Sequence, residues 1–184
     1  MKDQISQVII NLLEINLYKD IYVSTICEKV PISRQTFYRY FHSKDAVIEW
    51  FIEQDFMKNA FPLFRYHLKE KGVSAFFSYI KENPLFYQRI LEHDNGILLE
   101  HCLKKAYNTA ADYTSTFSLP VKKRCYTINP KVYRLYAING IVAILIYWIQ
   151  DNMKISEEDI AKDLYLMMEE PLGIVRDYYL TIKE

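Results

Sequence analysis

The sequence predicts an all-α protein with a small N-terminal helical domain over residues 1–50 and a larger helical domain over residues 51–184. Two observations predict this class. Apolar residues recur with the i, i+3, i+4, i+7 spacing of amphipathic helices through most of the chain. Only 4 Gly and 6 Pro interrupt 184 residues, and 51% of the residues are hydrophobic, which favours long helices packed around a core.

The first two helices and the break between them follow from this spacing. Residues 2–17 place apolar side chains on one face of a helix. The segment Tyr18-Lys19-Asp20 is predicted to be a polar break. A shorter helix is expected from near Val23, with Ser24 or a neighbour as its cap, and Pro31 ends it because proline has no N–H to donate.

The stretch SRQTFYRYF, residues 33–41, predicts a second short helix. Ser33 is placed to cap it by accepting from the backbone N–H of Gln35 or Thr36. Ile32 and Phe37 have the spacing of a hydrophobic staple. This helix is expected to end near Phe41-His42, where Ser43 caps a long helix that runs toward Asn59.

The remaining elements are predicted in the same way. Pro62 and Lys71-Gly72 are expected to bracket one helical segment, and Asn83-Pro84 to open another. Asp94-Asn95-Gly96 interrupts the pattern. The other helices are predicted over residues 73–81, 97–113, 131–152 and 156–179, the last with a bend near 171–173, and residues 115–130 are a connection.

The charge balance, the cysteines and the N-terminal residues limit the possible partners and cellular compartment of the protein. The 23 basic and 23 acidic residues balance, so only local clustering of charge can support binding to nucleic acid. Three cysteines without a CxxC spacing suit a reducing compartment. The first ten residues lack the features of a signal peptide. The most apolar run, residues 137–149, is shorter than the roughly 20 residues of a spanning helix. We therefore expect a cytoplasmic protein without a membrane partner.

Two short helices joined by a tight turn have the spacing of a helix-turn-helix motif. In its second helix, Phe37, Tyr40 and Phe41 can form the buried face. The outward side chains can bind base edges or phosphates, because arginine suits guanine and glutamine suits adenine. From Lys29 through Lys44 the chain carries four bases and no acid. The alternative is a solvated helix face over an aromatic core.

Across residues 5–55, the order of apolar positions, the Ile-Ser-Arg-x-Thr-Phe-Tyr-x-Tyr-Phe block and the following Ser43-Lys44-Asp45 resemble the DNA-binding domain of TetR-family transcriptional regulators. The resemblance implies double-stranded DNA with a near-palindromic operator as the partner. It places Arg34, Gln35 and Thr36 toward bases and Tyr38 and Lys44 on phosphates. The full set of candidate DNA-binding residues is Ser24, Ser33, Arg34, Gln35, Thr36, Tyr38, Arg39, Tyr40 and Lys44.

The chain departs from the family pattern at two positions. The family has a small hydroxyl residue near Tyr22 and a glycine where Pro31 stands. A glycine there would use φ > 0, which we expect Pro31 to be unable to adopt. The turn between the two motif helices is therefore expected to differ locally.

The segment from Tyr136 to Met168 resembles the last two helices of the same family, which pack against their copies in a dimer. The first of them is apolar on several sides, so it is buried within the subunit or by a partner. A homodimer also suits two recognition helices about 34–36 Å apart. The candidate interface residues are Ile138, Ile141, Val142, Leu145, Trp148, Ile149, Leu164 and Met168. The alternative is a central helix of a monomer.

A small-molecule effector would bind in the C-terminal domain, where no buried charge stands out. The candidate pocket residues are Phe64, Phe77, Phe86, Tyr87, Tyr107 and Tyr113, although aromatic residues at helical spacing also form ordinary cores. His93 and His101 lack the spacing of metal ligands on one helix. No group of nucleophile, base and orienting residue is visible, so we expect no enzyme, no metal and no cofactor.

The sequence thus predicts a DNA-binding transcriptional regulator of the TetR type, a repressor released from its operator by a small effector. Two alternatives stay open at this point. One is a dimer that acts mainly as a protein-binding co-activator or adaptor. The other is an enzyme or carrier built on the helical body.

Overall fold

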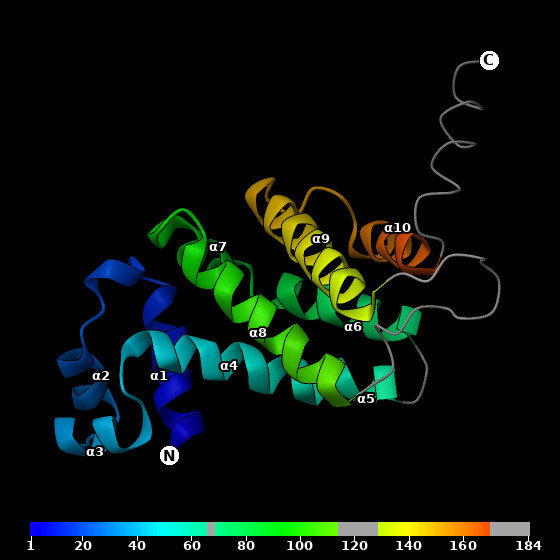
Figure 1. Cartoon of the computed structure of the whole chain (residues 1–184). Coiled ribbons are helices and arrows are strands. Elements are labelled where there is room, and N and C mark those ends of the chain that lie inside the picture. The colour runs from blue at the N-terminus through cyan, green and yellow to red at the C-terminus, as the bar shows by residue number, and fades with distance from the viewer. Residues whose placement is uncertain (66–68, 114–128, 170–184) are drawn as a thin grey trace.

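The computed structural model describes residues 1–65, 69–113 and 129–169, and every regular element within these ranges is a helix. The predicted all-α class is confirmed. Figure 1 shows the first three helices as a separate group at one end of the molecule, with α4 and α8 running side by side away from that group into the helical body.

The N-terminal group begins with α1 (Lys2–Leu13), which buries Ile5, Ile9 and Leu13. This helix is shorter than predicted. Both the backbone N–H and the side-chain amide of Asn16 donate to the Leu12 carbonyl at 2.9 Å, and these bonds end the helix before residue 17. The predicted polar break is a 3₁₀ turn, η1 (Tyr18–Asp20), in which Tyr18 is only 1% exposed.

The helix-turn-helix pair consists of α2 (Val23–Lys29) and α3 (Arg34–Tyr40). They are followed by α4 (Lys44–Asn59), whose start is fixed by Ser43, as predicted. The Ser43 side-chain oxygen accepts a hydrogen bond from the backbone N–H of Ala46 at 3.1 Å. Because α4 is unbroken from 44 to 59, it crosses the boundary predicted at residue 50 without interruption.

The described part of the body contains six further helices: α5 (Phe61–Arg65), α6 (Lys69–Glu82), α7 (Pro84–His93), α8 (Ile97–Tyr113), α9 (Pro130–Gln150) and α10 (Glu157–Glu169). Asn83-Pro84 opens α7 as predicted. The predicted break at Lys71-Gly72 is wrong, because Gly72 is buried inside α6. The expectations for residues 115–128 and for the bend at 171–173 lie outside the described ranges.

A tight turn joins α7 to α8 at Asp94-Asn95-Gly96, as predicted. The Asp94 carboxylate accepts from the backbone N–H of Leu98 at 3.0 and 3.2 Å. Gly96 has a φ of +86°, and a Cβ added there would lie 2.8 Å from the Leu91 side chain. The backbone conformation therefore favours glycine, and any larger residue would also have to displace the Leu91 side chain.

The body has an aromatic core in which each polar tip needs a partner. Trp148 of α9 is fully buried, and its indole N–H donates to the Ile155 carbonyl at 2.8 Å. Its ring packs edge-on against Phe77 of α6, with 5.0 Å between the ring centres. On the far side of α6 from α4, α10 packs along the helix (Figure 1).

By length and composition alone, α9 could cross a membrane, since residues 131–150 have a mean hydropathy of 1.6. The run of residues 137–149, which was expected to be too short to span, lies within this longer helix. A core helix of a soluble bundle satisfies the same criteria. Here α9 packs against α7 and α8, and Leu145 and Trp148 are fully buried between these helices and the rest of the body.

Candidate nucleic-acid interface

The start of α3 is fixed by Ser33. Its side-chain oxygen accepts the backbone N–H of Thr36 at 3.0 Å, and the two hydroxyl oxygens lie 2.9 Å apart. The predicted cap is confirmed, with Thr36 as the donor. Ser33 and Thr36 therefore position the helix as well as facing outward, because their hydroxyls already bond to each other.

The two faces of α3 divide largely as predicted. Phe37 is fully buried and Phe41 is 4% exposed, and these two side chains anchor the helix. α3 packs against α2, and the Phe41 ring lies edge-on to Trp50 of α4 with 5.9 Å between ring centres. Tyr40 is half-buried and packs at the edge of the core. The side chains that remain exposed are those of Arg34, Gln35, Tyr38 and Arg39.

Neighbouring rings orient part of this exposed face. The Arg39 guanidinium lies over the Tyr40 ring, 5.4 Å from its centre. The Tyr38 ring packs edge-on against Phe37 at 5.5 Å while 55% of Tyr38 stays exposed. These contacts restrict the rotamers of two side chains that carry donors suited to phosphate oxygens, which reduces the entropy lost on binding.

The turn before α3 contradicts the expectation for Pro31, because this residue has a φ of +25°. The backbone N–H of Ile32 donates to the Cys27 carbonyl at 3.0 Å, which is the long hydrogen bond of a Schellman helix ending. The turn therefore keeps the positive-φ path on which glycine is favoured. The proline ring is strained in this position, since it prefers a φ near −65°, and it has no N–H for the second bond of the motif.

The predicted cap of α2 is also corrected. The N-cap residue is Tyr22, which makes no side-chain capping bond and is 64% exposed. Ser24 lies inside α2 and is half-buried, so it does not cap. Tyr22 therefore leaves the first N–H groups of α2 without a side-chain acceptor, where a small hydroxyl residue would supply one.

Between α2 and α3 lies an open groove of about 510 Å³ beside Pro31. Glu28 of α2 and Arg34 of α3 give its two walls opposite charges. The groove extends the exposed face of α3 toward α2. Ser24, which precedes the other candidate DNA-binding residues in the sequence, lines the same groove as Arg34, and Cys27 and Ile32 also line it.

Lys44 has a role that the sequence did not predict. Its ammonium group donates to the carbonyl oxygens of Tyr18 at 2.7 Å and Ile21 at 3.1 Å, and it lies over the Tyr18 ring. Burial lowers the pKa of Lys44, although nearby Asp45 opposes this shift. Lys44 thus fastens the start of α4 to the loop before α2, and its assignment as a phosphate contact stays a prediction.

Tyr18 links this corner to the body. Its hydroxyl donates to the Asp45 carboxylate, and its ring packs edge-on against His93 of α7, with 4.7 Å between centres. Burial and the neighbouring Asp45 raise the pKa of Tyr18 well above its ordinary value, so the hydroxyl stays protonated as a donor. A contact network therefore runs from the start of α4, which follows α3 in the chain, through Tyr18 to the end of α7.

The predicted effector pocket residues lie in a packed aromatic core. Phe77, Phe86, Tyr87 and Tyr107 are all buried. Phe86 contacts Phe51 and Tyr87, while Tyr107 contacts Phe56 and Phe76, with ring centres 4.9 to 5.7 Å apart. The side chains of Phe64 and Tyr113 lie outside the described part of the molecule. Their assignment to an effector pocket stays a prediction.

Ser6 is the one polar or charged residue that is buried by its overall exposure among the described residues, but a partly buried carboxyl that the sequence did not indicate is found on α4. The Asp55 carboxyl of α4 faces the interior, where burial raises its pKa to about 7. A hydrogen bond from Tyr79 of α6 and the charge of Lys58 oppose that shift without cancelling it. The sequence does not indicate this partial burial, because Asp55 stands among the polar residues Glu53, Gln54 and Lys58, a composition typical of a solvent-exposed helix face.

The predicted dimer residues are corrected by their burial. Within the subunit Ile138, Ile141, Val142, Leu145, Trp148, Ile149 and Leu164 are all buried, and the Met168 side chain is not among those described. They form the inner face of α9 and α10. The apolar side chains that α9 exposes are those of Val132, Leu135, Tyr136 and Tyr147, with Gly140 and Ala143 between them.

The two histidines considered as metal ligands lie apart. His93 packs on Tyr18, and His101 lies 3.7 Å from the Glu49 carboxylate, which also pairs with Lys105. Among the residues whose positions are described, no group of three His, Cys, Asp or Glu side chains could hold a metal ion. Burial raises the pKa of Cys102 to about 12, so its thiol stays protonated.

A three-helix unit whose third helix is exposed, capped and basic, joined through α4 to a helical body, defines the class of helix-turn-helix DNA-binding regulators. A family model described as "Transcriptional regulator C-terminal region", from the TetR group, matches residues 69–170, more than half of the chain. The chain therefore belongs to the TetR family of transcriptional regulators, whose members bind DNA.

One similar sequence is the HTH-type dhaKLM operon transcriptional activator DhaS of Lactococcus lactis subsp. lactis (strain IL1403). It is 33% identical over 86 residues, a match that spans 47% of this chain and 46% of that protein. The match therefore covers about half the length of this relative.

Solved structures share the fold over nearly the whole chain. The dihydroxyacetone kinase operon activator DhaS has a TM-score of 0.64 at 24% identity, covering 91% of this chain and 93% of its own. The TetR-family repressor AlkX from Dietzia sp. strain DQ12-45-1b has a TM-score of 0.58 at 17% identity, covering 91% and 92%. The fatty acid degradation regulator FadR from Bacillus halodurans has 0.55 at 13%, covering 94% and 96%.

Proposed function

We propose that this chain is a cytoplasmic, homodimeric regulator that inserts α3 into the major groove of a near-palindromic operator. The observation that supports this most is the exposed face of α3, where Arg34, Gln35, Tyr38 and Arg39 stand over a buried Phe37 anchor. Arginine and glutamine are suited to guanine and adenine edges, and Tyr38 and Arg39 to phosphates.

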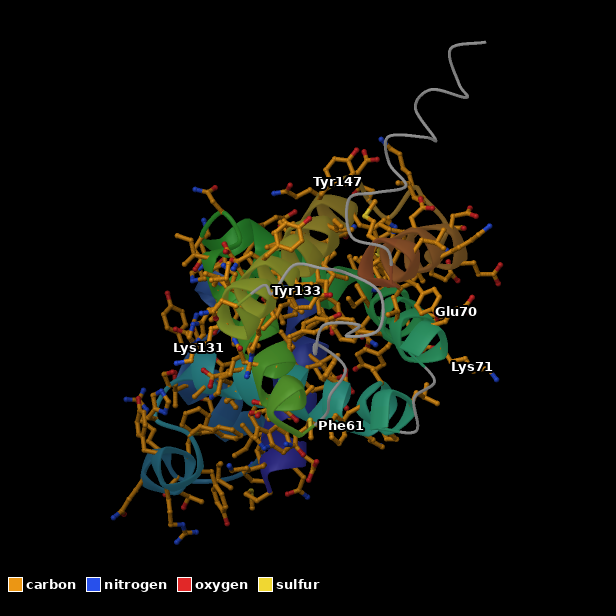
Figure 2. The ribbon with its side chains drawn as sticks, turned by 45° about the vertical axis from the view of Figure 1, so that its right-hand side comes forward. Phe61, Glu70, Lys71, Lys131, Tyr133 and Tyr147 are labelled. Carbon is orange, nitrogen blue, oxygen red and sulfur yellow. The ribbon has the colours of Figure 1, made fainter. Side chains whose placement is uncertain are left out.

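The dimer is proposed to form through the outer face of α9. Val132 and Leu135 are 60% and 64% exposed, and Tyr147 is 59% exposed. Figure 2 shows Lys131 and Tyr147 near opposite ends of this helix, with the Tyr147 side chain directed away from the bundle. A Cβ at Gly140 would meet nothing within 4 Å in the subunit, so the middle of this face can accept a close backbone approach.

For the direction of control, we propose a repressor that a small effector in the C-terminal body releases from its operator. Binding to the body would favour a dimer in which the two α3 helices are wrongly spaced for DNA, and by reciprocity DNA would weaken effector binding. The contacts of α4 and α7 with both the recognition domain and the body support such coupling.

Activation is the second candidate, because the sequence relative that matches 86 residues is a transcriptional activator. A regulator of this kind would bind next to a promoter and recruit a protein partner, and DNA binding by α3 is common to both candidates. The sign of regulation is decided by transcription from the flanking promoter with and without the protein.

The DNA-binding proposal is tested by footprinting on the DNA that flanks the gene, followed by affinity measurements over a range of salt concentrations. Arg34→Ala is expected to weaken operator binding by about 1–3 kcal/mol if it reads a base. Tyr38→Ala should weaken it less and on all sequences alike. Lys71→Ala, which removes an exposed charge from the body, serves as the control. Equal affinity for operator and unrelated DNA would contradict the proposal.

A further inference from the structure

Three buried side-chain atoms among the described residues have no hydrogen-bond partner, and two of them are oxygens. The oxygens are Oδ2 of Asp55, on α4, and the hydroxyl of Tyr87, on α7, while the third atom is Nε of Arg89, also on α7. Tyr87 is completely buried. Buried oxygens of this kind are uncommon, because leaving one unbonded loses the hydrogen bonds it would make with water.

The two groups belong to one electrostatic cluster. The charge of Asp55 raises the pKa of Tyr87. Tyr79 interacts electrostatically with both, and its hydroxyl donates a hydrogen bond to the Asp55 carboxyl. Asn59 also donates to Asp55, at Oδ1 and 3.4 Å, which leaves Oδ2 as the open position. Three helices therefore contribute: α4 supplies Asp55, α6 supplies Tyr79 and α7 supplies Tyr87.

Aromatic residues adjoin both oxygens along the chain, and one of them is in direct contact with Tyr87. Phe56, next to Asp55 in α4, packs on Phe76 and Tyr107 with ring centres 4.9 to 5.0 Å away, and Tyr87 packs on Phe86 at 5.0 Å. Aromatic walls suit an apolar stem, and their faces attract organic cations. The setting therefore combines two open oxygens with surfaces that favour an amphiphilic ligand.

The cluster is rich in acceptors and poor in positive charge. The charged or titratable groups that act on Asp55 and Tyr87 are Tyr79, Glu82, Lys58, Tyr107 and Cys102. Lys58 is the one cation among them, and it is exposed to solvent. A protonated amine has only donors and carries the compensating charge, whereas a hydroxyl supplies one donor and no charge.

We propose that the effector site of this regulator recognises an organic ammonium group on an apolar stem, with Asp55 and Tyr87 as its hydrogen-bond acceptors. This inference rests on the proposed effector control and names the chemical class of the effector. Asp55 supplies the counter-charge through Oδ2, Tyr87 accepts a second N–H, and the rings around Phe56 and Phe86 hold the stem.

Calorimetry with two matched pairs of probes tests this inference on the full-length protein. The pairs are 2-phenylethylamine with 2-phenylethanol, and hexylamine with 1-hexanol. Each amine should bind at least about tenfold more tightly than its alcohol at pH 8. Because the pKa of Asp55 is about 7, the affinity for the amine should rise about tenfold from pH 6 to pH 8, while that for the alcohol stays constant.

Two variants and one control locate the binding. Asp55→Asn should remove the preference for the amine, and Tyr87→Phe should weaken amine binding while leaving an intact fold. Glu70→Gln removes an exposed carboxylate from α6 that is not among the groups acting on Asp55 or Tyr87, and it should change neither result. Equal binding of amine and alcohol, an amine preference that survives Asp55→Asn, or no binding of either amine would each overturn the inference.

The operator affinity of the ligand-free protein is measured in the same series, because it tests the proposed function separately. If the ligand-free protein binds its operator and no amine binds, the inference about the effector is wrong and the DNA-binding proposal stands. If amines bind through Asp55 but the protein has no operator, the reverse holds.

Discussion

The ammonium group of Lys44 donates a hydrogen bond to the carbonyl oxygen of Tyr18 at 2.7 Å and lies 4.1 Å from the centre of the Tyr18 ring. A second bond to the Ile21 carbonyl holds the loop before α2 against the start of α4. This lysine follows the recognition helix by four residues. Its hydrogen bonds therefore help to fix the orientation of α2 and α3 relative to α4.

Replacing Lys44 by Met should lower the free energy of unfolding by about 1–3 kcal/mol, because two carbonyl oxygens lose a charged donor. Urea titration measures this change. Lys19→Met, at an exposed position nearby, is the control and should have little effect. If Lys44→Met instead leaves stability unchanged and lowers the slope of log affinity against log salt by about one, then Lys44 contacts a phosphate.

Pro31→Gly should stabilise the protein by about 1–2 kcal/mol, although such a change more often destabilises by loosening the unfolded chain. The reason is the φ of +25°, which strains proline and suits glycine, together with the restored N–H at the end of α2. Pro84→Gly is the matched control. Pro84 occupies the first turn of α7, where proline fits, so its replacement should destabilise. Thermal unfolding of both variants compares the signs directly.

Asp55→Asn should flatten the pH dependence of stability. Because burial raises the folded-state pKa of Asp55 from 3.8 to about 7, the folded state holds a proton that the unfolded state releases. Stability from this group is therefore present at low pH and is lost as the pH rises from about 4 to about 7. Between pH 4 and pH 8, the free energy of unfolding of Asp55→Asn should rise by about 1–2 kcal/mol relative to that of the wild type, allowing for solvent screening.

Urea titrations at several pH values measure this gain. Glu70→Gln, which removes an exposed carboxylate in the first turn of α6, should leave the pH dependence of stability like that of the wild type. Parallel profiles for the wild type and Asp55→Asn would contradict the assignment of Asp55 as an interior carboxyl.

Two substitutions at Gly140 test the stability of the subunit and the stability of the proposed dimer independently. Gly140→Ala meets no obstacle within the subunit and should stabilise α9 by about 0.5–1 kcal/mol. Gly140→Arg should give a folded monomer with weak operator binding, because its side chain occupies the surface on which the second copy packs. Light scattering with size-exclusion chromatography measures the mass. An intact dimer for Gly140→Arg, like that expected for the exposed control Gln54→Arg, would exclude this face.

Local signals in the sequence predicted most of the recognition domain. Ser33 and Ser43 cap α3 and α4 because their hydroxyls act on backbone groups only three residues away, which the sequence shows directly. The same locality predicted the opening of α7 at Asn83-Pro84. Where a feature depends on neighbours in space, prediction failed. Lys44 is bonded to carbonyls that lie 23 and 26 residues earlier in the chain, and no local pattern indicates them.

The body shows the same distinction. α9 is apolar on all sides, so the sequence could not decide which side faces α7 and α8, and the predicted dimer residues fell on the buried side. Asp55 was overlooked because its surroundings include α6, which supplies Tyr79 and packs against α4 from later in the chain. Pro31 was misjudged because the Schellman bond from Ile32 to Cys27 imposes a backbone path that proline alone would not take.

Because α4 is continuous, it connects the Lys44 ammonium at its start with the partly buried Asp55 carboxyl in the body. Lys44 and Asp55 are 11 residues apart on one unbroken helix, a distance of about 16 Å at 1.5 Å per residue. The helix acts as a lever. A tilt of about 5° around its interior end would carry the Lys44 end through about 1.4 Å. A displacement of that size exceeds the tolerance of a hydrogen bond, so in the proposed DNA complex a small change around Asp55 would weaken the contacts with the operator.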